Sequence, residues 1–95
     1  MKKMNELAKE YRLPMQSTQE DLESRWATVL KYGNKILLAG YWYSQDGKSW
    51  ISAVYDFMED NKTEVDDIIV IREISGDRFE DAGHAIKWAI ECASR

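Results

Sequence analysis

His84 and Cys92 are the only histidine and the only cysteine of the chain, so they are the first candidates for acid–base or nucleophilic chemistry. A cysteine nucleophile needs a base within hydrogen-bonding distance of its sulfur. Both residues fall in a segment predicted to be one helix, where a separation of eight residues corresponds to about 12 Å along the axis. The two side chains therefore cannot form a catalytic pair. We expect His84 to be solvated and Cys92 to be a packing residue.

No other arrangement of residues predicts catalysis or metal binding. The sequence has no Cys/His cluster with zinc spacing, and its five glycines form no phosphate-binding loop. Acidic residues gather between Asp56 and Asp67, but without the central glycine and terminal glutamate of an EF-hand loop. We interpret this run as a solvated loop, with a weak divalent-cation site or a contact for a basic partner as the alternatives. We expect a non-enzymatic protein with no cofactor and no metal.

The composition indicates one globular domain spanning residues 1–95. Hydrophobic residues make up 44% and charged residues 32% of the chain, which fits a folded protein. A single cysteine allows no intramolecular disulfide, whereas secreted domains of this size usually contain several, so we expect a cytoplasmic protein. No signal peptide follows Met1, and no apolar run is long enough to cross a membrane.

Charge is distributed unevenly along the chain, which carries a net charge of −4. Residues 1–35 contain seven Lys/Arg and five Asp/Glu, whereas residues 36–95 contain six and twelve. Binding to a nucleic-acid backbone needs a basic face, so this acidic body argues against it. The same charge favours a protein partner with a basic surface.

Three helices are predicted. Met4, Leu7, Ala8 and Tyr11 share one helix face, and Pro14 ends that helix. The four residues 17–20 match a capping box that opens a second, short helix. The final helix, of about 15 residues, is expected to be capped by Ser75 or Asp77. Its apolar stripe comprises Phe79, Ala82, Ile86, Ala89, Ile90 and Ala93.

A hairpin is the clearest element of the predicted sheet. Residues 36–43 and 50–57 flank Asp46-Gly47, a dipeptide that favours a type I′ turn. This turn would pair Trp42 with Ile51 and Tyr43 with Trp50, and it would gather the apolar positions of both strands on one face. The segment 44–50 also resembles a shortened Asp-box, the hairpin-turn motif of sialidase-like propellers. That resemblance implies a tight turn at Asp46-Gly47 and no activity.

Two further segments complete the sheet. Residues 25–32 are rich in strand formers and end at Gly33-Asn34, a hairpin signal, although continuation of the preceding helix is the alternative. Residues 68–71 are apolar on both faces and predict an internal strand. The predicted fold class is α+β: a three- or four-stranded antiparallel sheet with N-terminal helices and one long C-terminal helix packed on one face.

The second face of the hairpin carries more apolar residues than a solvated face should. In the predicted register its members are Trp26, Leu30, Leu37, Tyr41, Tyr43, Trp50 and Val54. Either the N-terminal helix covers this face, or its aromatic end stays exposed as an interface. Trp88 is expected on the polar side of the final helix, where it either lies flat over a neighbouring loop or helix or anchors a partner.

From these features we expect a non-enzymatic protein-interaction module: a small acidic regulator, inhibitor or adaptor, of the kind that phages and mobile elements encode. It would bind a protein partner, or a second copy as a homodimer. The expected contact residues are Tyr41, Tyr43, Trp50, Trp26 and Trp88. The alternative is a single-stranded nucleic-acid-binding protein whose sheet aromatics stack on bases. Only Arg25, Lys35 and Lys48 lie near that face to contact phosphates, which disfavours the alternative.

Overall fold

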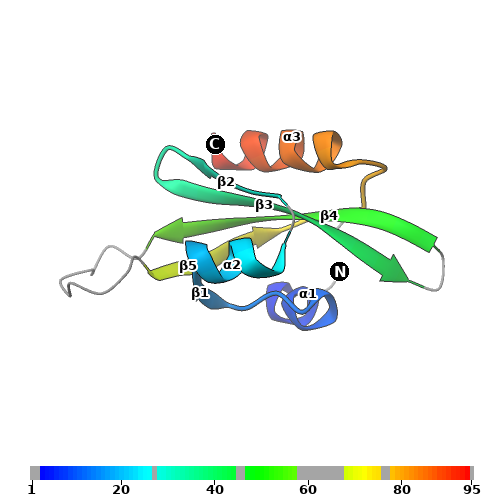
Figure 1. The fold of residues 1–95 in the computed structure, drawn as a ribbon, viewed down its shortest axis with the longest axis horizontal. Helices are drawn as coiled ribbons and strands as arrows, with labels where there is room; N and C mark the ends of the chain where they lie inside the picture. Colours follow the sequence, from blue (N-terminus) through cyan, green and yellow to red (C-terminus); the bar gives the residue numbers. More distant parts are fainter. Residues whose placement is uncertain (1–2, 27, 45–46, 58–67, 76–77, 95) are drawn as a thin grey trace.

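Figure 1 shows the computed structural model of the chain, which describes residues 3–26, 28–44, 47–57, 68–75 and 78–94, apart from the side chains of residues 42–44 and 47–48. Over these described residues the chain is an α+β protein with three helices and a five-stranded antiparallel sheet. Its elements are α1 (Met4–Tyr11), β1 (Gln16–Thr18), α2 (Gln19–Arg25), β2 (Thr28–Tyr32), β3 (Lys35–Ser44), β4 (Gly47–Phe57), β5 (Ile68–Ile74) and α3 (Ala82–Ala93).

The strand order in the sheet is β1-β5-β4-β3-β2, with every neighbouring pair antiparallel. The prediction of a strand within residues 25–32 is confirmed, because α2 ends at Arg25 and β2 begins at Thr28. The internal position of the strand that begins at Ile68 is also confirmed, since β5 lies between β1 and β4. The predicted strand number was too low because β1 has three polar residues and no recognisable alternation.

The register of the β3–β4 hairpin differs from the predicted one by two residues. Ser44 pairs with Gly47, so Gly47 belongs to β4 rather than to the turn, and Tyr41 instead of Tyr43 faces Trp50. Asp46, the other predicted turn residue, lies outside the described residues. Because side chains alternate with a period of two, a shift of two residues leaves each side chain on its predicted face.

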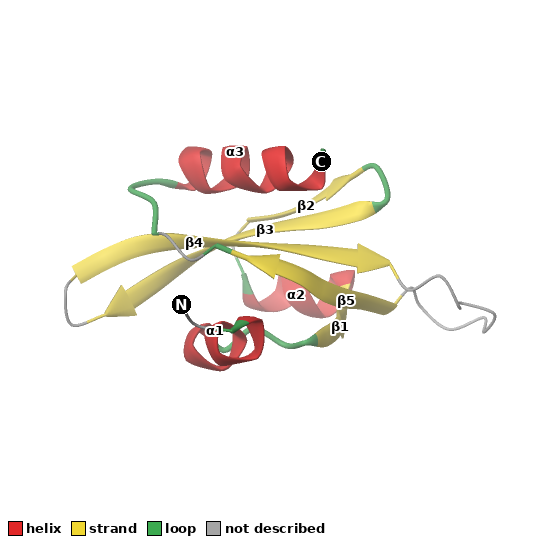
Figure 2. Cartoon of the chain, turned by 180° about the vertical axis from the view of Figure 1, so that it is seen from behind, coloured by secondary structure: helices red, strands yellow, loops and turns green. Residues whose placement is uncertain are grey.

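Helices cover both faces of the sheet, so the prediction of helices on one face was wrong. Figure 1 shows α3 on one side of the sheet and α1 and α2 on the other, and Figure 2 shows the same three layers from behind. The N-terminal helices therefore do not cover the face that carries Tyr41 and Trp50. The physical reason is that the hairpin is apolar on both faces, and each face needs its own cover.

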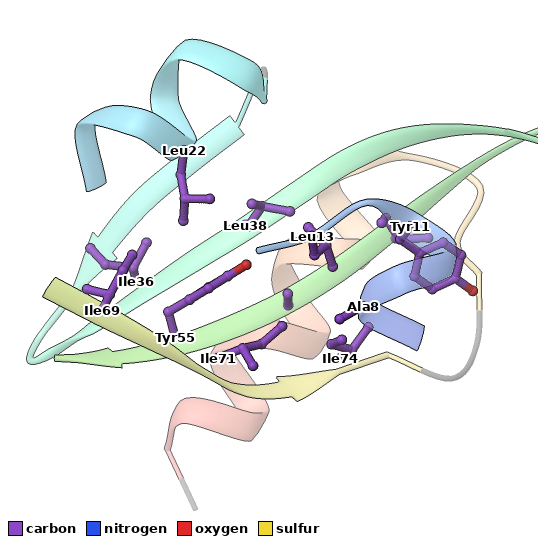
Figure 3. Close-up of a cluster of buried hydrophobic side chains, with 12 residues drawn as sticks. Ala8, Tyr11, Leu13, Leu22, Ile36, Leu38, Tyr55, Ile69, Ile71 and Ile74 are labelled. Carbon is purple, nitrogen blue, oxygen red and sulfur yellow. The ribbon is translucent and has the colours of Figure 1, made fainter. Parts of the chain in front are cut away.

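The larger core lies between the sheet and the two N-terminal helices (Figure 3). Tyr55 is fully buried there, and its hydroxyl donates a hydrogen bond of 2.7 Å to the carbonyl oxygen of Pro14. Burial raises the pKa of Tyr55, because the ionised phenolate would lose its hydration. The buried members of this core are Ala8, Tyr11, Leu13, Leu22, Ile36, Leu38, Ile51, Ala53, Tyr55, Ile69, Ile71 and Ile74.

A β-bulge lets β5 contribute three isoleucines to this core. Val54 pairs with Glu73 and Tyr55 with Ile71, which leaves Arg72 as an extra, unpaired residue. Ile71 and Ile74 are three residues apart and would face opposite sides of a regular strand. The extra residue restores both to the same side, where they join the core.

The helix caps differ from the predicted ones. Thr18 caps α2 by accepting a hydrogen bond of 3.2 Å from the Asp21 N–H, one residue later than predicted. Asp81 caps α3 by accepting a hydrogen bond of 2.8 Å from the His84 N–H. The two predicted caps of α3 do not have this role in the described structure: Ser75 is buried and accepts from the Ser52 N–H, and Asp77 lies outside the described residues. Within the described residues, no helix is long and apolar enough to cross a membrane.

Candidate functional site

Small side chains bring α3 close to β3 and β4. Ala85, Ala89 and Cys92 are the buried residues of this helix, and the last two pack against Leu37 and Val54 of the sheet. The predicted stripe is therefore rotated, because Ile90 is exposed while Ala85 and Cys92 face inward. The rotation puts short side chains against the strands, which permits close packing of helix on sheet. It also brings Trp88 to the flank of the helix that faces the sheet.

Four aromatic residues are neighbours in pairs on the α3 side of the sheet. Tyr41 and Trp50 face each other on β3 and β4, with ring centroids 4.8 Å apart and planes tilted by 37°. Trp50 and Phe79 exchange two backbone hydrogen bonds of 2.8 Å, so their side chains leave the same face of the sheet. The rings of Phe79 and Trp88 are 6.3 Å apart. We call Tyr41, Trp50, Phe79 and Trp88 the aromatic row.

The aromatic row is most accessible at its Tyr41 end. Tyr41 is 43% exposed, whereas Trp50, Phe79 and Trp88 are each partly buried. Trp88 also packs against the cluster beneath α3, so the row is fixed from the side of the helix. The row therefore presents mainly Tyr41 to solvent, with the partly buried rings of Trp50, Phe79 and Trp88 beside it.

Two polar contacts lie near the start of α3. Asp81 contacts the imidazole Nδ1 of His84 at 2.8 Å in addition to accepting the backbone N–H of the same residue. That backbone hydrogen bond is the main cause that lowers the pKa of Asp81, followed by the contact with the imidazole. Arg78 lies 3.7 Å from Glu10 of α1. Within the described part of the chain, no three His, Cys, Asp or Glu residues gather where they could hold a metal ion.

The structure brings together some of the predicted contact residues and separates others. Tyr41 and Trp50 share one face of the sheet, as predicted, but they lie side by side only because the observed register pairs Tyr41 rather than Tyr43 with Trp50. Trp88 is half-buried against Phe79 and the sheet, so its predicted place on the polar side of the helix was wrong. The side chain of Tyr43 lies outside the described structure. Trp26 is on the opposite face of the sheet.

Trp26 is displaced from the aromatic face because it precedes β2 and ends α2. Its N–H donates to the Leu22 carbonyl as the helix C-cap, so the alternation of the strand does not apply to it. Its ring lies against Gly40 on the side of the larger core, where a Cβ atom at position 40 would overlap the indole. The indole nitrogen is buried without a hydrogen-bond partner in the described structure. A glycine within an apolar strand was the available sequence signal for this close approach.

Phe79 is the one member of the aromatic row that was not among the predicted contact residues. It was placed in the apolar stripe of the last helix, whereas α3 begins only at Ala82. An isolated bridge to Trp50 holds it instead as a short extension of the sheet. A single bridging residue has no periodic pattern of its own, so no sequence signal could have identified this role.

Fold and site together define a small α+β domain that presents a partly exposed aromatic row on one face of an antiparallel sheet. Residues 13–93 match the family described as nucleotide modification associated domain 4, and the chain belongs to this family. The matched region contains the whole aromatic row, all five strands, α2 and α3, and it begins after α1. No curated protein and no solved structure matches the chain.

Proposed function

We propose that this chain is a non-enzymatic binding module of a nucleotide-modification system, and that its aromatic row docks on a protein partner. The observation that carries the proposal is the Tyr41 end of the row, where a 43% exposed tyrosine packs on Trp50 with ring centroids 4.8 Å apart. The description of the family supplies the biological setting. The partner is then an enzyme of that system, which the chain regulates, inhibits or recruits in the cytoplasm.

The chemistry of the aromatic row suits protein recognition. Tyrosine and tryptophan dominate the energetics of protein interfaces, since they bury a large area with few rotatable bonds. Trp50 is held in a strand and Trp88 in a helix, so little conformational entropy remains to be lost on binding. A row that is already ordered before binding therefore supports a docking role.

The charge of the chain supports a partner of a particular kind. The net charge is −4, and it arises from residues 36–95, which contain the aromatic row. Enzymes that act on phosphate-bearing substrates present basic surfaces, and an acidic protein is attracted to such surfaces at long range. An acidic module with an aromatic contact face is therefore suited to an enzyme that handles nucleotides or nucleic acid.

The proposal is tested by capturing partners from native cells with two matched variants. Tyr41→Ala removes the exposed tyrosine of the row, and Tyr32→Ala removes one that is 42% exposed on β2. A docking tyrosine contributes about 2 kcal/mol, so Tyr41→Ala should weaken capture about 30-fold while Tyr32→Ala leaves it unchanged. Equal recovery of the same partner by both variants and the parent chain would refute the assignment.

A second candidate function is stacking on single-stranded nucleic acid. It is favoured by the place of Tyr41 and Trp50 on an open sheet face together with the family description. Titration of the tryptophan fluorescence with single-stranded oligonucleotides at low and high salt tests it. Binding that depends on Tyr41 and not on Tyr32 would promote this candidate, and absence of binding at low salt would remove it.

A further inference from the structure

The two edges of the sheet are protected to very different degrees. At one edge, β1 is three residues long and is enclosed between Pro14 and the start of α2 at Gln19. At the other edge, β2 is five residues long, and its register with β3 runs without a bulge. Natural sheets usually shorten, bulge or charge their edge strands to prevent association with other chains. The first edge follows this rule and the second does not.

Apolar side chains are concentrated along the β2 edge. Leu30 is 46% exposed, and it faces Leu37, which places it on the same side of the sheet as α3. Tyr32, also on this side, is hydrogen-bonded through its hydroxyl to Ser94 at 3.3 Å. Ile90 lies one helical turn before Ser94 and is 36% exposed. Three of the five large apolar side chains that are exposed in the described structure therefore lie here; the full set is Met15, Leu30, Tyr32, Tyr41 and Ile90.

The only charge on β2 does not defend the edge. Lys31 points to the opposite face, and its ammonium lies 5.6 Å from the centre of the Phe57 ring of the same chain. In the described structure, no backbone group of residues 28–32 is hydrogen-bonded outside its pairing with β3. The outer backbone of β2 is thus available to another strand.

We propose that β2 pairs antiparallel with the β2 strand of a second copy, about a twofold axis at Leu30, to give one continuous ten-stranded sheet from two five-stranded ones. Such pairing is self-complementary. Leu30 meets Leu30 of the partner subunit, Val29 meets the partner's Lys31, and Thr28 meets the partner's Tyr32. No two like charges oppose each other, and opposed like charges are what destabilises a pair of strands.

The geometry of the sheet also favours a second copy as the occupant. A twofold axis perpendicular to the sheet places both α3 helices on the same side, so Ile90 and Tyr32 of each copy flank the junction. The strand is only about 17 Å long at 3.4 Å per residue, so the interface is small and the dimer should form in the micromolar to millimolar range. Thr28 pairs with Ala39, so Tyr41 lies beyond the end of β2 and stays accessible in the dimer.

A charge-swap experiment at the axis tests this arrangement, with light scattering and sedimentation as the readouts. The parent chain, 11.1 kDa as a monomer, should approach twice this mass as its concentration rises. Leu30→Asp and Leu30→Lys should each raise the dissociation constant roughly tenfold, because each variant loses the Leu30–Leu30 contact and also opposes two like charges at the axis. Because residue 30 meets its own counterpart, an equimolar mixture of the two variants should recover the dimer.

Two controls show whether a lost dimer is due to unfolding of the variant and whether dimerisation is independent of the aromatic row. Leu30 is nearly half exposed, so both variants should keep the circular dichroism spectrum of the parent chain. Met15→Asp and Tyr41→Ala, at exposed sites away from β2, should remain dimeric. A parent chain that stays monomeric at millimolar concentration, a dimeric Leu30→Asp variant or a mixture that stays monomeric would each overturn the proposal. Capture of the protein partner does not depend on any of these results.

Discussion

The two faces of the sheet are covered in different ways: one is filled by a large buried core, and the other keeps exposed apolar side chains. On the face below α1 and α2, every member of a twelve-residue core is buried, including Leu22 and Tyr55. On the face below α3, the buried cluster of the described residues comprises Leu37, Val54, Ala89 and Cys92. The first face is closed by bulky side chains from three segments of the chain. The second face is closed by one helix, which leaves Tyr41 exposed at one end and Leu30 at the other.

The size of the covering side chains explains this contrast. Tyr11, Leu13 and Leu22 reach the sheet from α1, the following turn and α2, so they fill a wide area. The fully buried side chains of α3 are small, whereas its larger residues, Ile86 and Trp88, pack against the sheet cluster only partly buried. An apolar sheet face under such a narrow cover retains exposed apolar margins, and these are the margins that we assign to binding.

The largest expected effect comes from truncating a side chain in the twelve-residue core, on the face of the sheet that α1 and α2 cover (the closed face). Leu22 is fully buried, so Leu22→Ala should reduce the free energy of unfolding by about 2–5 kcal/mol. The comparison variant is Ile90→Ala in α3, the helix that covers the other face. Ile90 is 36% exposed, so this change should cost no more than about 0.5 kcal/mol. Urea denaturation followed by circular dichroism measures both. Comparable losses for the two variants would show that the faces do not differ as described.

A smaller effect is expected where Trp26 covers Gly40 on the closed face. Gly40→Ala places a methyl group where the indole ring lies, and displacing the ring should cost about 1–3 kcal/mol and alter the tryptophan fluorescence. Gly83→Ala is the matched control in α3. A Cβ atom there makes only an ordinary contact with Asp81, and the loss of backbone freedom in the unfolded chain should stabilise by about 0.4–1 kcal/mol. Opposite signs for the two variants are the expected result, and a neutral Gly40→Ala would disprove the close packing.

The faces of the hairpin could be predicted from the sequence because only the parity of each position matters. The turn predicted at Asp46-Gly47 gave a register that differs from the observed one by two residues. Ile36 and Leu38 nevertheless lie on one face of the sheet, and Leu37 and Tyr41 lie on the other, as predicted. The identity of the covering helix could not be predicted in the same way. An apolar residue on each face shows that both faces need a cover, but it does not say which helix provides it.

The parts of the candidate site that the sequence did not reveal depend on contacts between distant segments. Phe79 joins the aromatic row through one bridge to Trp50, a residue that is far away in the chain. Trp26 leaves the row because α2 ends one residue earlier and the indole finds room over Gly40. Neither the place of Phe79 nor that of Trp26 follows from local periodicity, because each depends on a contact with a residue of another segment, Trp50 or Gly40.

Truncation of Tyr41 in the aromatic row should destabilise the fold less than Leu22→Ala or Gly40→Ala. Tyr41→Ala removes a tilted stack on Trp50, which is worth about 0.5–1.5 kcal/mol beyond its buried area. Tyr32→Ala, which removes a single exposed hydrogen bond to Ser94, should cost less. Thermal unfolding of the two variants beside the parent chain tests this order. A cost for Tyr41→Ala as large as that for Leu22→Ala would mean that the tyrosine is a core residue rather than a contact residue.

The smallest effect concerns the start of α3, the helix that packs on the Leu37 and Val54 face of the sheet. The His84 N–H lowers the pKa of Asp81 below its ordinary value of 3.8, so the folded state binds this proton more weakly than the unfolded state. Stability from this cap is therefore complete above the unfolded pKa and is lost as pH falls through the folded pKa. Thermal unfolding between about pH 5 and pH 2 should show this loss in the parent chain and a weaker dependence in Asp81→Asn, which keeps the cap but removes the charge. Because the carboxylate is largely exposed to solvent, the difference should be small. Identical pH profiles would mean that Asp81 does not hold α3 through its charge.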